Sequence, residues 1–519
     1  MSPFRAPCTL QTLTLPNARA RQSAAEAKRA KTGEHDDTSA AVEGVVRAAW
    51  EGTVLETLKE YISIPNQSPL FDPEYATNGY QEQVADLFVD WAKAHAPFAK
   101  VEKLQLEGRT PLIFLEIEAT GGAAFEASPT CLMYGHADKQ PPFLPWREGL
   151  GPWTPVVEDG KLYGRGGADD GYAMFGALTA LKALREGGTP HARTVVLIEF
   201  AEESGSPGLM EYVEHLSDRI GDVGLVVCLD SGSGNYEQLW MTTTLRGMCV
   251  GTLKVEILKE GVHSGLSSGI VPSSFRILRH VLDRVEDSAT GLVTEQAAAF
   301  LACDVPPQRS QQAAVAATFL GDAVHQSFPF VEGAGPHAVS NAELLLRRTW
   351  RPTISVTGAE GFPPLRSAGN VLRPFTSIKV SVRLPPAVDA KAAAEQLKAL
   401  LERDAPHGAN VSFHVDKFAN GWDAPLLAPW LEKSAEDASQ AYFRLPACYM
   451  GEGGSIPFMG MLGKRFPKAQ FVVTGVLGPA SNAHGPNEFL HLEHGTKLTM
   501  CVANICRDFG AHHVAAGAQ

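Results

Sequence analysis

Hydrophobic positions in the first half of the chain predict short buried strands that alternate with amphipathic helices. Residues 130–134 (TCLMY), 194–200 (TVVLIEF) and 224–229 (GLVVCL) are continuous apolar runs. Strands that are apolar on both faces belong to a sheet that helices cover on both sides. Residues 172–188 place leucines on one helical face and end in two glycines, which predicts an amphipathic helix. This alternation favours an α/β sandwich.

The pattern changes near residue 246. The order of predicted elements becomes β-α-β-β-α-β, which is typical of a ferredoxin-like α+β unit. These elements are a strand at 250–258, a helix at 273–287, strands at 353–357 and 377–384, a helix at 390–404 and a strand at 411–418. Residues 288–350 contain several prolines and predict a loop-rich insertion inside this unit.

The α/β pattern resumes after residue 421 with a predicted strand at 470–477. We therefore predict an α/β catalytic domain that an α+β domain interrupts, preceded by a polar, disordered lead-in. The predicted boundaries are 1–40 for the lead-in, 41–245 and 422–519 for the catalytic domain, and 246–421 for the inserted domain.

Composition excludes several classes of protein. The 519 residues are 44% hydrophobic and carry a net charge of −13, which disfavours nucleic acid and anionic membranes as partners. No apolar run approaches the roughly 18 residues of a membrane span. The eight cysteines are scattered without a CxxC pair, as expected of free thiols in a reducing compartment. The first 25 residues contain arginines and no acid, which is also typical of an organelle transit sequence. They contain no secretory hydrophobic region, and of these alternatives we expect a cytoplasmic protein.

Five clusters of acids and histidines follow predicted strands or precede a predicted helix. They contain His136 with Asp138, Asp169 with Asp170, Glu202 with Glu203, Asp230, and His484. Each cluster alone has an ordinary explanation, namely a surface turn, a helix cap, an acidic loop or a structural histidine. Together they supply mixed nitrogen and oxygen ligands at the edge where α/β sheets place their binding sites. One carboxylate beyond the ligands would be free to act as a base in two-metal hydrolysis.

At these clusters the chain resembles the M20 metallopeptidases, which include carnosine-type dipeptidases, glutamate carboxypeptidases and aminoacylase-like deacylases. The resemblance covers most of the chain from about residue 41. The matching segments, in the family's order, are GHADKQP, LYGRGGADDG, AEESGS, LDSG, VHSG (262–265), GEGGSIP (451–457) and AHGPNE (483–488).

The resemblance implies two divalent metal ions per chain, zinc or alternatively manganese. It implies that His136 and Asp230 hold one ion, Glu203 and His484 the other, and that Asp169 bridges them. Glu202 would be the general base that takes the proton of a water bridging the metals, which gives the attacking hydroxide, and later delivers that proton to the leaving amine. Asp138 would orient His136. It also implies a cis peptide bond between Asp169 and Asp170.

The inserted domain resembles the family's lid and dimerisation domain. The resemblance implies that His263, from a partner subunit, stabilises the oxyanion, and that Arg383 grips the substrate carboxylate. Without the resemblance, His263 would be interpreted as a turn residue and Arg383 as a surface charge at the end of a strand. Asn370 and the turn formed by Gly453, Gly454 and Ser455 would line the substrate pocket. A homodimer follows, because a residue donated in trans makes the partner part of the site.

Several functional alternatives stay open at this stage. Asp230 and the long insertion resemble the dipeptidase branch, whereas an N-acyl-amino acid amidohydrolase would use the same machinery. Gly171 stands where the family usually has lysine, and Lys139 replaces an apolar residue, which leaves the natural substrate open. A nucleotide-binding oxidoreductase is disfavoured because the glycines at 164–167 do not fit G-x-G-x-x-G. A non-catalytic metal-binding scaffold is disfavoured because all ligand positions and the base are present.

Overall fold

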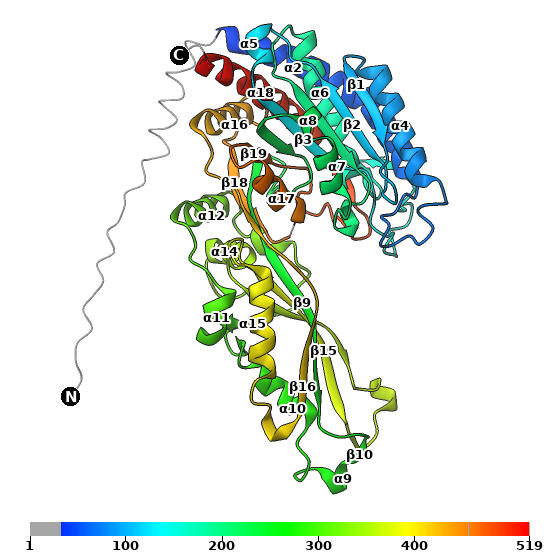
Figure 1. Cartoon of the computed structure of the whole chain (residues 1–519), viewed down its shortest axis with the longest axis vertical. Coiled ribbons are helices and arrows are strands. Elements are labelled where there is room, and N and C mark those ends of the chain that lie inside the picture. The colour runs from blue at the N-terminus through cyan, green and yellow to red at the C-terminus, as the bar shows by residue number, and fades with distance from the viewer. Residues whose placement is uncertain (1–32, 455, 518–519) are drawn as a thin grey trace, which may run out of the picture.

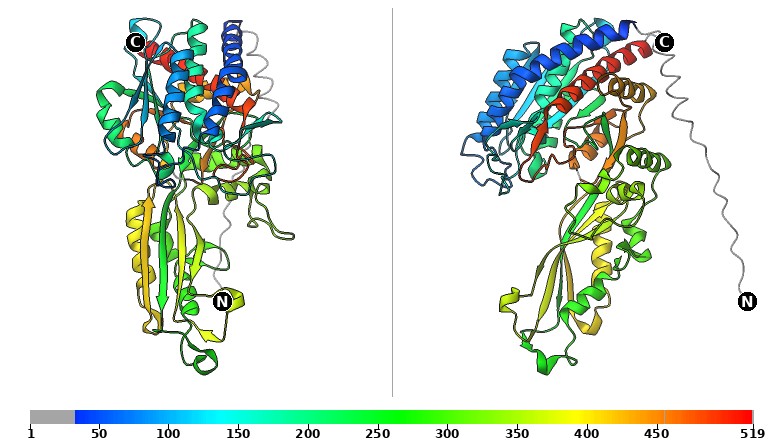
Figure 2. Two further views of the ribbon diagram at one scale, coloured as in Figure 1. Left: turned by 90° about the vertical axis from the view of Figure 1, so that its right-hand side faces the viewer. Right: turned by 180° about the vertical axis from the view of Figure 1, so that it is seen from behind.

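The computed structural model describes residues 33–454 and 456–517 of the chain. The molecule is elongated, with an α/β body at one end and a narrow arm formed by the inserted unit at the other (Figure 1). Figure 2 shows the body and the arm from two further directions. Residues 1–32 of the predicted lead-in lie outside the described residues. Helix α2 (Gly33–Ala49) begins within the last residues of the range predicted for the lead-in.

A six-stranded sheet forms the centre of the body. Its strands, in spatial order, are β1 (Ala99–Leu104), β2 (Leu112–Ile117), β6 (Thr194–Glu199), β3 (Thr130–His136), β7 (Val223–Cys228) and β19 (Gln470–Val473). The last four are parallel to one another, whereas β1 and β2 are antiparallel to their neighbours. Every residue of β3 and β6 is buried, as their continuous apolar sequences predicted. The predicted α/β fold class is confirmed.

Helices cover both faces of this sheet because alternate strand residues point to opposite sides. Two hydrophobic clusters result, with Met133 and Val196 on one face and Leu132 and Val195 on the other. The first face is covered by α2, α3 (Leu55–Ser63), α4 (Tyr80–His95), α6 (Ala173–Glu186), α16 (Pro429–Tyr442) and α18 (Leu492–Gly517). The second is covered by α7 (Leu209–His215), α8 (Ser217–Ile220) and α17 (Pro457–Arg465). None of the helices described here combines the length and the apolar character needed to cross a bilayer.

The inserted unit has the predicted ferredoxin-like topology. Its four antiparallel strands lie in the order β13 (Thr353–Glu360), β15 (Phe375–Leu384), β9 (Gly247–Glu256) and β16 (Asn410–Ala419). Helices α10 (Ser274–Leu282) and α15 (Ala390–Glu402) pack on the sheet and share its hydrophobic cluster. The tip of the arm carries β10 (Val262–His263), α9 (Ser264–Ser267) and β14 (Val371–Leu372) (Figure 1).

Two short three-stranded sheets complete the body. One contains β17 (Trp422–Asp423), β8 (Trp240–Leu245) and β18 (Cys448–Glu452), and the other β20 (Phe489–His491), β5 (Lys161–Tyr163) and β4 (Val156–Glu158). The chain leaves the body directly after β8 and returns through β17, which pairs with it. Both connections to the arm therefore lie side by side.

The predicted loop-rich insertion at 288–350 is wrong, because this segment is largely helical. It contains α11 (Glu295–Leu301), α12 (Pro307–Leu320), α13 (Ala323–Gln326) and α14 (Asn341–Thr349). Pro306 and Pro307 stand at the start of α12, where proline is well tolerated, so they begin a helix and do not break one. Ala316 and Leu345 of these helices pack against Met450 of β18, which stabilises them on the body.

Candidate metal centre

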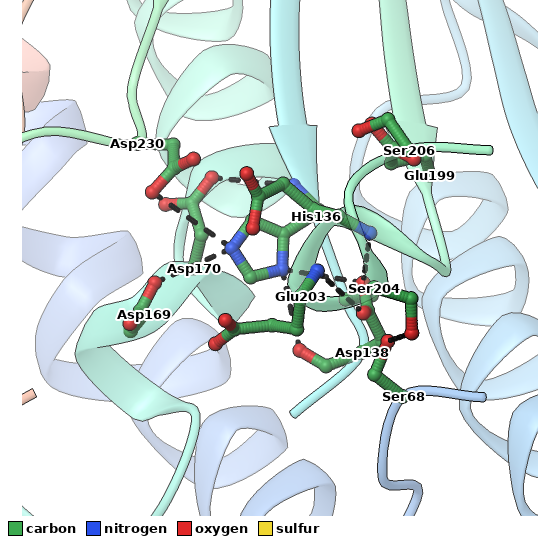
Figure 3. A network of polar contacts seen from close by, with 12 residues as sticks. Ser68, His136, Asp138, Asp169, Asp170, Glu199, Glu203, Ser204, Ser206 and Asp230 are labelled. Atoms are coloured by element: carbon green, nitrogen blue, oxygen red, sulfur yellow. Dashed lines mark hydrogen bonds and ion pairs between the residues drawn. The ribbon is translucent and has the colours of Figure 1, made fainter. Parts of the chain in front are cut away.

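The carboxyl ends of three neighbouring parallel strands bring most of the predicted residues to one edge of the central sheet. His136 ends β3, Glu202 and Glu203 follow β6, and Asp230 follows β7. Since β3 lies between β6 and β7, these residues meet at one place, as expected for an open α/β sheet. Figure 3 shows His136 among the surrounding carboxylates.

Asp169 lies between the two predicted histidine ligands. Its Oδ1 is 3.3 Å from His136 Nε2, and its Oδ2 is 2.9 Å from His484 Nε2. The two oxygens of one buried carboxylate thus face two different imidazoles, which is the arrangement a bridging ligand needs. Asp169 reaches this position from the turn before α6, and its peptide bond to Asp170 is cis, as the resemblance implied.

The remaining predicted ligands flank this bridge. Glu203 Oε1 is 3.4 Å from His484 Nε2, and Asp230 Oδ1 is 3.8 Å from His136 Nε2. Potential ligand atoms of His136, Asp169 and Glu203 lie within 4.8 Å of one another, as do those of His136, Asp170 and Asp230. The structure therefore brings together all five residues that the resemblance implied as ligands.

Asp138 holds the loop that carries the paired glutamates. Its Oδ1 accepts a hydrogen bond from the Glu202 backbone N–H and its Oδ2 one from the Glu203 N–H, both at 3.1 Å. His136 Nδ1 lies 3.4 Å from Asp138 Oδ1 and 3.2 Å from the Asp138 carbonyl oxygen. A proton on Nδ1 directed at these oxygens leaves the Nε2 lone pair for a metal.

The electrostatics of the cluster favour bound cations. Carboxylates outnumber imidazoles, and burial raises the pKa of Asp170, Glu202 and Asp230 well above the usual range of a carboxyl group. Burial alone would lower the pKa of His484, but its hydrogen-bonding contacts to Asp169 and Glu203 raise it to about 11. Asp170 Oδ1 is buried without a hydrogen-bond partner among the described residues. Buried like charges and an unsatisfied carboxylate oxygen of this kind fit divalent cations.

A buried ion pair joins the Asp169 loop to the His484 loop. The Arg165 guanidinium contacts the Glu488 carboxylate, and both side chains are almost fully buried. Glu488 Oε1 accepts a hydrogen bond from Gly166 N–H at 2.9 Å, and Arg165 Nη2 donates to the Gly485 carbonyl at 2.8 Å. Both residues lie inside the sequence motifs at 162–171 and 483–488, but the sequence analysis gave them no role.

Other supporting residues were also missed. Glu199 accepts hydrogen bonds from Tyr134 Oη at 2.6 Å and from Ser206 Oγ at 2.8 Å, and burial raises its pKa to about 7. Ser68 Oγ is 2.5 Å from Ser204 Oγ, beside the paired glutamates (Figure 3). Ser68 carries no sequence signal, since it lies in a loop outside every acidic cluster.

The predicted substrate-contacting residues fall into two groups, one at the junction of body and arm and one at the tip of the arm. The carbonyl oxygens of Gly453 and Gly454 accept hydrogen bonds from Arg246 at the junction of body and arm. Burial is the main cause that lowers the pKa of Arg246 to about 10, and the nearby positive charges of Arg383 and Arg348 lower it further. Arg383 therefore lies near the glycine turn. Ser455 lies outside the described residues.

The second group lies at the tip of the arm. His263 is exposed, and the Ser264 N–H beside it donates to the Asn370 carbonyl oxygen at 2.9 Å. β10, which ends at His263, lies at the end of the arm farthest from the central sheet (Figure 1). Within one chain, His263 and Asn370 are thus together but remote from the metal cluster.

Comparison with known proteins assigns the family. A family model described as peptidase family M20/M25/M40 matches residues 132–508, which include the metal cluster, the arm and the central sheet apart from β1, β2 and the start of β3. The chain therefore belongs to this peptidase family, as the resemblance of its motifs indicated.

Two curated relatives and one solved structure illustrate which proteins the chain is similar to. The chain is 27% identical over 443 residues to a cysteinylglycine-S-conjugate dipeptidase of Corynebacterium striatum, covering 84% of this chain and 90% of that protein. It is 25% identical over 369 residues to the beta-Ala-His dipeptidase of Mus musculus, covering 67% and 71%. The solved structure of the dipeptidase Dug1p from Saccharomyces cerevisiae superposes with a TM-score of 0.67 at 18% identity, covering 91% and 98%. The last comparison shows the shared fold.

Proposed function

We propose that this protein is a metallodipeptidase that hydrolyses the amide bond of dipeptides or similarly small peptide-like substrates. The observation that carries the proposal is the position of Asp169, whose two oxygens face His136 and His484. The dipeptidases among its relatives support the choice of a dipeptide substrate.

His136 and Asp230 would hold one divalent ion, Glu203 and His484 the other, and Asp169 would bridge them. The mixture of imidazole and carboxylate ligands supports zinc, with manganese as the alternative. When bound, such ions polarise the scissile carbonyl and lower the pKa of a water molecule. Asp138 would keep the His136 ring in the orientation that this ligation requires.

Glu202 would act as the general base and then as the general acid. Its backbone N–H is fixed by Asp138, and its side chain shares the acidic site with Glu203. It would take the proton from the attacking water and pass it to the departing amine nitrogen as the carbon–nitrogen bond breaks. A buried carboxyl group with a raised pKa suits a role that requires both protonation states.

Substrate contacts would come from the junction and from a second subunit. Arg383 would bind the substrate carboxylate near the turn at Gly453 and Gly454. His263 and Asn370, at the tip of the arm, would reach the metal cluster of a partner subunit, where His263 would stabilise the oxyanion. We therefore propose a homodimer, since the tip of the arm lies far from its own cluster (Figure 1).

The described cysteines, all free and mostly buried, support a reducing compartment, and we propose a cytoplasmic location. Cys8 lies outside the described residues.

The test compares native protein with Glu202→Gln, measuring both metal content and hydrolysis of a dipeptide panel. Glu214→Gln, an exposed glutamate on α7, serves as the matched control. We expect about two divalent ions per chain in all three proteins, and loss of turnover by about 10²–10⁴-fold only in Glu202→Gln. Cleavage of N-acylated amino acids in place of dipeptides would make the protein an amidohydrolase. Absence of metal from correctly folded native protein would refute the proposal.

A further inference from the structure

Lys139 is a fully buried lysine directly beside Asp138. Its amino group donates to the carbonyl oxygens of Tyr61 and Ile64, both at 2.6 Å, and lies 3.8 Å from the centroid of the Tyr61 ring. Burying a lysine is costly unless its donors are satisfied. These contacts direct the amino group at one place, the carboxyl-terminal end of helix α3.

The sequence of α3 explains why that end accepts a lysine. The carbonyl of Tyr61 would normally receive a hydrogen bond from the N–H four residues later, but residue 65 is proline and has none, and the carbonyl accepts from the Ile64 N–H at 3.1 Å instead. Lys139 adds a second donor to this carbonyl from a distant part of the chain. A cationic side chain also interacts favourably with the carboxyl-terminal end of a helix.

The segment after α3 holds the loop that carries the first metal ligand. The carbonyl oxygen of Ala137, between His136 and Asp138, accepts from Tyr61 Oη at 3.0 Å and from Asn66 Nδ2 at 2.7 Å. The backbone N–H of Lys139 donates to the Asn66 carbonyl at 3.2 Å. The loop that positions His136 and Asp138 is thus fixed from the side of α3.

Lys139 and Tyr61 also pack against the loop that carries Asp169. A methyl group at Gly166 would lie 2.7 Å from Lys139 Cε and 2.9 Å from Tyr61 Oη. A methyl group at Gly171 would lie only 2.1 Å from Tyr61 Cε1 and 2.8 Å from the Gly166 carbonyl oxygen. Glycine at 166 and 171 therefore makes room for the lysine and the tyrosine.

We propose that Lys139 and Tyr61 form a clamp that positions the loops of His136 and Asp169. The ring of Tyr61 fills the space that any side chain at position 171 would need. This inference rests on the proposed metal centre but not on its substrate.

The experiment measures the dissociation constant of the apo-protein for zinc in Lys139→Met, which keeps side-chain length and removes the donors. Lys59→Met is the matched control, because the Lys59 side chain lies on the same helix and pairs with Glu56 at the surface. We expect zinc binding to weaken by about 10- to 100-fold in Lys139→Met and to stay native in the control. Turnover at saturating zinc should fall with little change in KM.

A purely structural role for Lys139 would lower the melting temperature but leave the zinc affinity of the folded protein native, and that result would overturn the proposal. If Lys139→Met does not fold, Tyr61→Phe decides the question, since it keeps the ring and removes only the bond to Ala137. We expect zinc binding to weaken about two- to tenfold in that variant, and native affinity would overturn the proposal. Native protein that binds zinc but cleaves no dipeptide would refute the proposed function and leave this test intact.

Discussion

Replacing Asp138 by asparagine tests how the metal centre is preorganised. In the native structure its two oxygens each accept one backbone hydrogen bond, from the N–H groups of Glu202 and Glu203, at 3.1 Å. Asparagine has a single acceptor oxygen, so its amide nitrogen would face either one of these N–H groups or His136 Nδ1. The side chain is fully buried, so water does not replace the lost acceptor.

The magnitude follows from these contacts. A hydrogen bond to a charged group contributes about 1.5–3 kcal/mol, and the substitution removes at least one of them. If the loss appears wholly in metal binding, it corresponds to about 10- to 150-fold weaker affinity. The substitution leaves both the Glu203 ligand and the His136 ring less well oriented. We therefore expect a larger change in zinc affinity than in the free energy of unfolding.

Calorimetric titration of zinc into the apo-proteins measures this affinity directly. Asp86→Asn is the control, because Asp86 is largely exposed and pairs with Lys103 at the surface, where an ion pair contributes about 0–1 kcal/mol. Circular dichroism establishes that each variant is folded. A folded Asp138→Asn protein with an affinity within threefold of native would refute the reasoning, because the backbone hydrogen bonds would then not position the ligands.

Two further outcomes follow from charge and packing. The contacts of His484 with Asp169 and Glu203 raise its apo-state pKa to about 11, so the stabilisation from its proton is complete below about pH 6.5 and is lost toward pH 11. Because metal must displace this proton, zinc titrations in buffers of different ionisation enthalpy should show proton release and an affinity that rises with pH; a pH-independent affinity would contradict this. Gly135→Ala should lower the free energy of unfolding by about 1–3 kcal/mol in urea denaturation, because the new methyl would lie 2.3 Å from a side-chain carbon of α6. Gly44→Ala, which meets nothing within 4 Å in helix α2, should be neutral or stabilising, and equal effects of the two changes would refute the packing argument.

Much of the fold was readable from local sequence. The apolar runs that became β3, β6 and β7 are buried on both faces, and no polar alternation competes with that interpretation. The insertion at 288–350 was misread because proline was taken as a helix breaker, whereas Pro307 begins α12. Local composition does not distinguish a proline in the first turn of a helix from one in the helix interior. The difference is that the backbone N–H groups of the first turn have no partner within the helix, so a proline there removes no hydrogen bond.

The chemistry of the ligands was also determined locally. His136, Asp169, Glu203, Asp230 and His484 stand out because acids and histidines directly follow buried strands or enter turns. Their mutual arrangement is not local: His136 and His484 are far apart in the sequence, yet both contact Asp169. The parallel strands of the central sheet bring these residues together, because their carboxyl ends lie at one edge of the sheet.

Only the tertiary structure decided which residues support the site. Ser68 and Tyr61 lie outside every motif, and Lys139 lies inside GHADKQP without a role that the sequence assigned; all three act through contacts that join segments distant in the chain. The sequence by itself determined the fold class and most element types, because these follow from hydropathy periodicity. It also placed acids and histidines in five clusters, among which the resemblance to the M20 peptidases implied the candidate ligands. Positions of supporting groups, and the remoteness of His263 from its own cluster, depend on strand order and on how the arm extends, which no local pattern encodes.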